Sequence, residues 1–201
     1  MSWIKTIDFS QATGTLKKIY EKITGPDQNV DNVLQVHSLR PHTLRGHMEL
    51  YKSVLHHANN TLPNWYLEAI GTFVSFLNQC DYCVDHHAQG LKRLLNDDEQ
   101  FNLTLHSIQR NRVEEAFEGK ELAGMNYAKK LTLSHHWITK KDFDNLKEAG
   151  FDDGEILEIN QVVSYFNYVN RTVVGLGVTT EGDILGLSPN NQADTEDWTH
   201  H

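Results

Sequence analysis

The only two cysteines of the chain, Cys80 and Cys83, lie three residues apart. Two cysteines placed at random would show that spacing on the order of once in a hundred chains, so the pairing calls for a chemical explanation. His87 follows Cys83 by four residues. Four residues make one turn of a helix, so in a helix the imidazole and the Cys83 sulfur lie on the same face. Because a neighbouring imidazole favours a thiolate near neutral pH, this stretch predicts a redox-active dithiol.

A carboxylate also falls within reach of this stretch if the chain turns back on itself. Glu68 precedes Cys80 by twelve residues, and on one unbroken helix it would lie about 18 Å away along the axis. A turn near Asn78 and Gln79 would instead bring Glu68 abreast of His87 on two antiparallel helices. A carboxylate on one imidazole nitrogen fixes the tautomer and raises the basicity of the other nitrogen. We therefore expect a proton relay from Glu68 through His87 to a thiol.

The elements that must position these residues are predicted to be helices, because apolar side chains recur at helical spacing along most of the chain. Asn78 is a plausible break, and Cys80 then lies near a helix N-terminus, where the dipole favours a thiolate. The last long segment is apolar on more than one side, which indicates a central helix or a subunit interface. Only residues 171–178 carry a weak strand-like pattern. The predicted fold class is all-α, with helices over residues 9–23, 32–39, 41–57, 63–77, 80–95, 97–108, 121–133, 139–149 and 152–177.

Size and composition are typical of a globular protein. The chain has 201 residues, 39% of them hydrophobic, and a mean hydropathy of -0.52. We assign residues 1–187 to a single helical domain, and residues 188–201, which are polar and acidic, to a tail or an arm onto another subunit. The formal charge of -9 argues against a nucleic-acid surface. Because neither a signal peptide nor an apolar run of roughly 20 residues is visible, we expect a cytoplasmic protein.

These residues resemble the motif of the alkylhydroperoxidase D-like proteins in the carboxymuconolactone decarboxylase superfamily. The motif is a glutamate, eleven residues, then Cys-x-x-Cys-x-x-x-His, and here it covers Glu68, Cys80, Cys83 and His87. Residues 37–47 and 167–171 further resemble the peroxidase-related branch of that superfamily. The resemblance spans most of the chain, from about residue 33 to residue 177.

The resemblance implies a helical, alkylhydroperoxidase D-like bundle that assembles as a homo-oligomer. It also implies an antioxidant oxidoreductase that reduces hydroperoxides through a dithiol/disulfide cycle, needs no cofactor, and draws electrons from a dithiol protein or a small thiol. We expect Cys83 to attack the peroxide and Cys80 to resolve the intermediate, with His87 as the base and Glu68 as its orienter. The opposite order of the two cysteines follows if the helix dipole dominates at Cys80.

Several other side chains receive a definite expectation. Tyr82 stands where the best-studied alkylhydroperoxidase D proteins have a histidine, and we expect it to line the substrate pocket. We expect His86 to be a surface neighbour of His87, and the Asn167, Asn170 and Arg171 side chains to serve the structure. Most of the chain's 12 histidines are expected to be surface or capping residues, among them His37, His42, His47, His56 and His57.

Alternative interpretations of the dithiol remain open. The two cysteines, His87 and Glu68 could make four metal ligands, although zinc sites usually draw ligand pairs from separate segments. The chain could then be a metal-binding or redox-sensing module without turnover. A third alternative is a disulfide reductase that acts on protein partners. Buried, inert cysteines are the plainest possibility, and the adjacent histidine argues against them.

Overall fold

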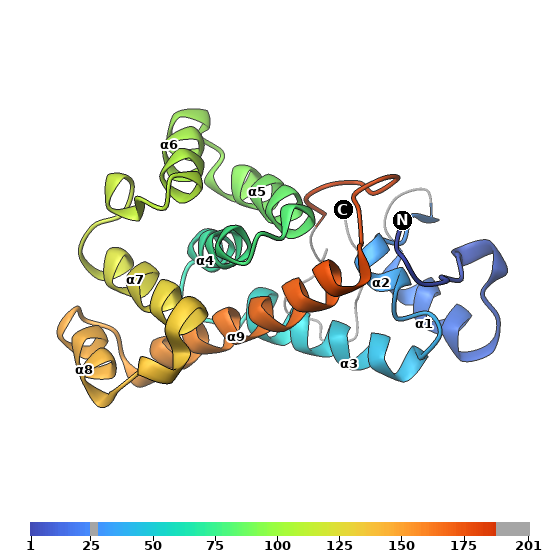
Figure 1. Cartoon of the computed structure of the whole chain (residues 1–201), viewed down its shortest axis with the longest axis horizontal. Helices are drawn as coiled ribbons and strands as arrows, with labels where there is room; N and C mark the ends of the chain where they lie inside the picture. Colours follow the sequence, from blue (N-terminus) through green and yellow to red (C-terminus); the bar gives the residue numbers. More distant parts are fainter. Residues whose placement is uncertain (25–27, 188–201) are drawn as a thin grey trace.

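The computed structural model describes residues 1–24 and 28–187, and within these ranges it contains helices and no strand (Figure 1). The all-α fold class predicted from the sequence is therefore confirmed. The predicted tail, residues 188–201, lies outside the described residues. The α-helices are α1 (Gly14–Ile23), α2 (Asn32–Gln35), α3 (Pro41–Tyr51), α4 (Asn64–Leu77), α5 (Asp81–Leu95), α6 (Asp98–Gln109), α7 (Gly119–Ser134), α8 (Lys140–Glu148) and α9 (Asp153–Leu176).

Short irregular turns join several of these helices. A π-helical turn over Lys52–His56 continues α3, and 3-10 turns cover Phe9–Gln11, Val113–Glu115 and His135–Trp137. Thr139 and Asp142 form a capping box at the start of α8, and Asp152 and Glu155 form another at the start of α9. The weak strand signal at residues 171–178 was misleading, because α9 continues to Leu176 and ends at Gly177.

Helix α4 occupies the middle of the molecule, with α5, α7 and α9 packed around it (Figure 1). Each residue from Tyr66 to Ser75 is buried, so this helix is enclosed on all sides. Helix α9 buries one face and exposes Leu157, Tyr168 and Val174 on the other. Of the two positions predicted for α9, the centre of the molecule is occupied by α4, and the apolar residues on the exposed side of α9 explain why its pattern is apolar on more than one side.

Close packing of α9 on α4 depends on Gly71. A Cβ atom at this position would lie 2.3 Å from the Phe166 ring, well inside contact distance. Phe166 is fully buried and meets the His87 ring edge-on, with 4.6 Å between ring centroids. A glycine on the central helix thus allows an aromatic residue of α9 to support the histidine of the predicted relay.

The chain after α9 folds back over the α2 end of the molecule. The Trp3 amide donates to the Leu176 carbonyl and the Thr179 amide donates to the Met1 carbonyl, at 2.8 and 2.9 Å. Figure 1 shows this segment, in red, passing close to α2 and to the end of α5. We call residues 178–187 the C-terminal clasp. No helix among the described residues is long and apolar enough to cross a membrane.

Candidate active site

A tight turn between α4 and α5 sets the geometry of the site. Gln79 adopts a left-handed conformation, with φ of 56°, and the Cys80 amide donates to the Ser75 carbonyl at 2.9 Å. The turn reverses the chain, so α5 runs back along α4 and the two helices lie side by side (Figure 1). The hairpin that the sequence predicted at Asn78 and Gln79 is present.

The two cysteines lie at the start of α5. Cys80 is the N-cap residue and Cys83 lies in the first turn; both are free and buried, and their sulfur atoms are 2.7 Å apart. The hydrogen bond from Cys83 lowers the pKa of the Cys80 thiol, and a hydrogen bond from Asn170 adds to this effect. Burial raises the pKa of Cys83 well above its usual value, and Cys80 contributes in the same direction. A single negative charge on the pair therefore prefers Cys80, and the remaining proton lies on Cys83.

Glu68 and His87 meet across the hairpin. Glu68 Oε2 lies 2.8 Å from His87 Nδ1, and the Glu68 side chain is 4% exposed. Burial raises the pKa of Glu68, but the charge and hydrogen bond of His87 together with the charge of His56 outweigh it and hold that pKa below its ordinary value. An ionised Glu68 accepts a hydrogen bond, so Nδ1 of His87 carries a proton and the lone pair of a neutral ring lies on Nε2. His87 is therefore oriented to act as a base through Nε2.

Glu68 also faces a second histidine. Its Oε1 atom lies 3.8 Å from His56 Nε2, and the same nitrogen contacts the Tyr51 hydroxyl at 2.8 Å. Both rings come from the end of α3 and the π-helical turn that follows it. Glu68 thus lies between two imidazoles, and both offset the energetic cost of burying its negative charge.

These groups surround one small cavity of about 60 Å³, which has room for a few water-sized molecules. Its lining includes Cys83, Glu68 and His87, whereas Cys80 is not part of it. The dithiol therefore meets the cavity through Cys83, while Cys80 lies behind it. The other lining residues used below are Asp31, His47, Tyr51, Tyr82, His86 and Leu187.

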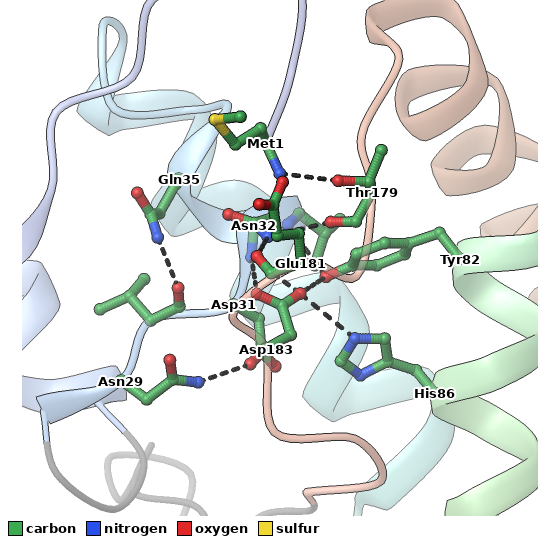
Figure 2. Close-up of polar contacts among 12 residues, drawn as sticks. Met1, Asn29, Asp31, Asn32, Gln35, Tyr82, His86, Thr179, Glu181 and Asp183 are labelled. Carbon is green, nitrogen blue, oxygen red and sulfur yellow. Dashed lines mark hydrogen bonds and ion pairs between the residues drawn. The ribbon is translucent and has the colours of Figure 1, made fainter.

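The C-terminal clasp contributes Leu187 to the lining of this cavity, and its Asp183 contacts two further lining residues, Tyr82 and His86 (Figure 2). The Asp183 carboxylate accepts hydrogen bonds from the Asn32 amide at 3.0 and 3.1 Å and from the Tyr82 hydroxyl at 2.6 Å. His86 Nε2 lies 3.3 Å from the same carboxylate. Figure 2 shows Tyr82 and His86 of α5 both pointing toward Asp183. One carboxylate thus joins the clasp to α2 and to α5.

Tyr82 lines the cavity as expected, but its hydroxyl is already engaged. It donates its proton to Asp183 and accepts a hydrogen bond from the Val33 amide at 3.1 Å. Burial raises the pKa of Tyr82 well above its usual value, and Asp183 and Asp31 add to the effect. Tyr82 therefore contributes a wall and an anchor for the clasp, and it has no proton left for a ligand.

A network of asparagine side chains supports the cysteines from α9. Asn78 donates to Asn167 at 3.2 Å and to Asn170 at 3.0 Å, and Asn170 in turn donates to Ser75 at 3.1 Å. Arg171 donates to the Asn167 side chain at 2.8 Å. These bonds tie the hairpin turn to the last helix, which is the structural role expected for these residues.

The structure brings Glu68, Cys80, Cys83 and His87 together as predicted, but the expectation for several histidines was wrong. His37, His47 and His56 are buried, and His86 lines the cavity. Their polar neighbours in sequence gave an apparently exposed pattern, because the groups they pack against come from distant segments. Asp31, Tyr51 and Asp183 also belong to the site, and no local sequence pattern indicates them.

A metal site is the alternative that geometry can address. Within residues 1–24 and 28–187, no group of three or more histidine, cysteine or acidic side chains is arranged to hold a metal ion. The nitrogen of His87 that faces Glu68 is engaged in a hydrogen bond.

Comparison with known proteins places the site in a family context. The profile of the carboxymuconolactone decarboxylase family matches residues 41–128, a range that contains Glu68, both cysteines and His87. No curated protein matches the chain.

Similar solved structures share the fold over most of their length. An uncharacterized peroxidase-related protein from Ralstonia eutropha JMP134, described as an alkylhydroperoxidase AhpD core, is 20% identical, with 90% of this chain and 93% of that chain covered and a TM-score of 0.75. An uncharacterized peroxidase-related protein from Silicibacter sp. TM1040 is 23% identical, with coverages of 84% and 83% and a TM-score of 0.70. The debrominase Bmp8 is 18% identical, with coverages of 88% and 91% and a TM-score of 0.69. At these identities the three structures establish a common fold.

Proposed function

We propose, on the premise that this chain belongs to the carboxymuconolactone decarboxylase superfamily, that it is a thiol-dependent peroxidase of the alkylhydroperoxidase type. The family match and the shared fold confirm the resemblance predicted from the sequence. The observation that carries the proposal is the shared cavity, where Cys83 and the Glu68–His87 pair line one small space. A peroxide in that space would meet both a thiol and a base.

The first chemical step forms a sulfenic acid. His87 removes one proton from the dithiol, and Glu68 stabilises the imidazolium that results. The remaining proton lies on Cys83, and its transfer to Cys80 across the 2.7 Å between the two sulfur atoms leaves Cys83 as the thiolate that reacts. The Cys83 sulfur attacks the outer oxygen of the hydroperoxide, the O–O bond breaks, and His87 returns its proton to the leaving alkoxide. The products are an alcohol and a sulfenic acid on Cys83.

The second step forms a disulfide and releases water. The Cys80 sulfur attacks the Cys83 sulfur, the S–O bond breaks, and hydroxide leaves with the proton from Cys80 as water. Overall, two thiols and one hydroperoxide give one disulfide, one alcohol and one water. The neighbouring Cys80 is suited to this role because its pKa is lowered and it lies behind Cys83, away from the cavity.

Regeneration requires two electrons from an external reductant. We propose a dithiol protein or a small thiol as the donor, and a cytoplasmic homo-oligomer as the working form. The disulfide then returns to the dithiol by thiol–disulfide exchange.

The proposal is tested by thiol titration before and after one equivalent of hydrogen peroxide. We expect the wild type to lose two thiols and to form an intramolecular disulfide. Cys80→Ser should retain a sulfenic acid on Cys83, which dimedone labelling and mass spectrometry detect. Cys83→Ser should lose reactivity toward peroxide by about a thousandfold or more, because Cys80 has no access to the cavity. His87→Ala should slow oxidation by about a hundredfold, as expected for loss of a general base.

Three results would contradict the proposal or its assignment of the cysteines. A stable sulfenic acid on Cys80 in Cys83→Ser, formed at the wild-type rate, would reverse the order of the cysteines. Thiols that ignore peroxide and are blocked by stoichiometric zinc would favour the alternative, a metal-binding or redox-sensing module. A disulfide reductase would instead react with protein disulfides while its thiols stay inert toward peroxide.

The likeness to a debrominase raises a second reaction for the same dithiol, which is reductive removal of bromide from an aromatic ring. The cavity argues for the smaller substrate, since about 60 Å³ is far below the ~300 Å³ and more of typical ligand pockets. Bromide release from 2,3,4-tribromopyrrole, measured beside the peroxide reaction, separates the two activities.

A further inference from the structure

His47 is a buried polar residue on the cavity that the proposed reaction does not use. It belongs to α3, is 4% exposed, and lines the same cavity as Cys83. Its Nδ1 atom is buried and has no hydrogen-bond partner among the described residues. An unpaired buried polar atom costs about 1–3 kcal/mol, so its retention beside a reactive thiol requires an explanation.

The surroundings of His47 keep its ring neutral. It packs against the rings of His37, Tyr165 and Tyr168, with centroids 5.0, 5.9 and 6.4 Å away. Burial, with a smaller contribution from His37, lowers the pKa of His47 to about 3. A neutral imidazole has one donor nitrogen and one acceptor nitrogen. Nδ1 of His47 is therefore an uncharged group with one unused hydrogen bond, and it belongs to a residue that lines the cavity.

His37 provides an internal comparison. Its Nδ1 atom lies 3.0 Å from the Thr43 hydroxyl, which donates its own proton to the Arg40 carbonyl at 2.9 Å. His37 must therefore donate to Thr43, and its Nε2 atom is left as an unpaired buried acceptor. His37 is not part of the cavity lining. The two histidines share burial and an unpaired nitrogen, and they differ in access to the cavity.

The charges around the cavity limit what His47 can bind. Asp31 and Glu68 are part of the lining, and Asp183 lies beside it (Figure 2). Among the described residues of the lining there is no lysine or arginine. A ligand that carries a carboxylate would therefore face the buried Glu68 and the half-buried Asp31, with no lysine or arginine in the lining to pair with it. This environment favours an uncharged ligand.

A hydroperoxide has the properties that the cavity requires. It is uncharged, and its O–OH group both donates and accepts, so it can pair with either tautomer of His47. A cavity of about 60 Å³ accepts hydrogen peroxide or a short alkyl group and excludes a lipid chain or an aromatic ring.

We propose that His47 orients the substrate by a hydrogen bond from the wall that α3 contributes to the cavity, and that the substrates are small, uncharged hydroperoxides. This inference rests on the proposed peroxidase function and specifies its substrate class. The bond fixes the direction of the O–O axis relative to the Cys83 sulfur. Displacement at oxygen needs an in-line approach, so orientation contributes directly to the rate.

The test measures the second-order rate of dithiol oxidation by ethyl hydroperoxide in His47→Phe, with His37→Phe as the matched control. We expect His47→Phe to react about tenfold more slowly, the ratio expected for one lost hydrogen bond, and His37→Phe to match the wild type. Alkylation by iodoacetamide, which has no hydroperoxyl group, should be unchanged in both variants. Equal loss in both variants, or equal loss toward iodoacetamide, would assign His47 a structural role and overturn the proposal.

A second measurement probes the cavity without any reaction. Titration with 1-propanol, which has the shape of ethyl hydroperoxide, should shift the ¹⁵N resonance of the His47 ring, whereas propionate should not. A shift with propionate as large as with propanol would overturn the selection for uncharged ligands. If wild-type thiols ignore every hydroperoxide while propanol still shifts His47, the peroxidase function fails and the cavity belongs to another small uncharged ligand. Wild-type reaction with cumene hydroperoxide as fast as with ethyl hydroperoxide would overturn the size limit.

Discussion

The two walls of the cavity are built in different ways. The inner wall comes from one stretch of twenty residues, in which a helical hairpin places Glu68 against His87 and both beside Cys83. The outer wall comes from α2, α3 and the C-terminal clasp, which are far apart in sequence and meet around Asp183 and His47. Local helix geometry holds the groups that react, and tertiary contacts enclose the space in which they react. Variants on the inner wall should therefore lower the rate with every hydroperoxide, and variants on the outer wall should change how the substrate is oriented, which substrates enter and how stable the fold is.

The largest effect is expected from the charge on the inner wall. Glu68→Gln keeps a hydrogen-bonding side chain beside His87 but removes the charge that stabilises the imidazolium, so peroxide oxidation should fall about a hundredfold. Because Glu68 acts through His87, the pH profile of the rate should shift as well, which a purely structural role would not cause. Stopped-flow measurement across pH 5–9 checks both.

Glu158→Gln is the matched control for this variant. The Glu158 carboxylate accepts hydrogen bonds from the Thr61 and Leu62 amides at 2.8 and 2.9 Å and does not line the cavity. It should lower stability and leave the pH profile of the rate unchanged. An equal rate loss in the two variants would show that Glu68 serves only the fold.

The charge of Glu68 should also make the free energy of unfolding depend on pH. Its folded pKa lies below the ordinary value of 4.5. The ionised form is thus favoured by folding, so its contribution is present above pH ~4.5 and is lost as the pH falls through the lowered pKa. The gap in unfolding free energy between wild type and Glu68→Gln should shrink from pH 7 to pH 3.

An intermediate effect is expected where the outer wall is joined together. Asp183→Ala removes the acceptor of the Asn32 amide and the Tyr82 hydroxyl, which should cost about 2 kcal/mol of unfolding free energy. It should also raise the rate with cumene hydroperoxide relative to ethyl hydroperoxide by several-fold, because the clasp loses its anchor.

The control is Asp144→Ala, which removes an exposed ion pair with Lys140 and should change neither quantity. Unchanged selectivity in Asp183→Ala, with stability lowered, would show that the clasp braces the fold without limiting access.

The smallest effect is expected from Asp31 on the same wall. Burial, opposed by His86 and reinforced by Asp183, raises the pKa of Asp31 from 3.8 to about 6. Folding therefore favours the protonated form of Asp31. The stability that this form contributes to the fold is lost as the pH rises through about 6. Asp31→Asn resembles the protonated acid, so its free energy of unfolding should exceed that of the wild type by about 1 kcal/mol at pH 8. This figure is smaller than the full pKa shift would give, because Asp31 is partly exposed to solvent. Thermal unfolding at pH 4 should show no such gain in stability. A gain of equal size at pH 4 and pH 8 would show that the substitution acts through packing and not through charge.

The same contrast explains how far the sequence could predict this protein. The hairpin, both cysteines, His87 and Glu68 follow from residue spacing, because helix rise and period are fixed by backbone geometry. Asp183 and His47 could not be found in this way. Their roles depend on contacts with segments 151 and 118 residues away, namely Asn32 for Asp183 and Tyr165 for His47, and no local pattern encodes those contacts. His56 was misjudged for the same reason, since the carboxylate it faces is on α4.

The left-handed turn at Gln79 makes the reactive half of this protein a self-contained unit. Adding one residue to that turn would rotate one helix by about 100° relative to the other and separate Glu68 from His87, while Cys83 and His87 stayed one turn apart. Conversely, the twenty residues from Glu68 to His87 grafted onto another antiparallel helix pair would keep their mutual placement and would need new partners for the contacts that Phe166, Asn170 and His56 make here. Such a graft would transfer the reactive residues, and the surrounding protein would determine which substrates reach them.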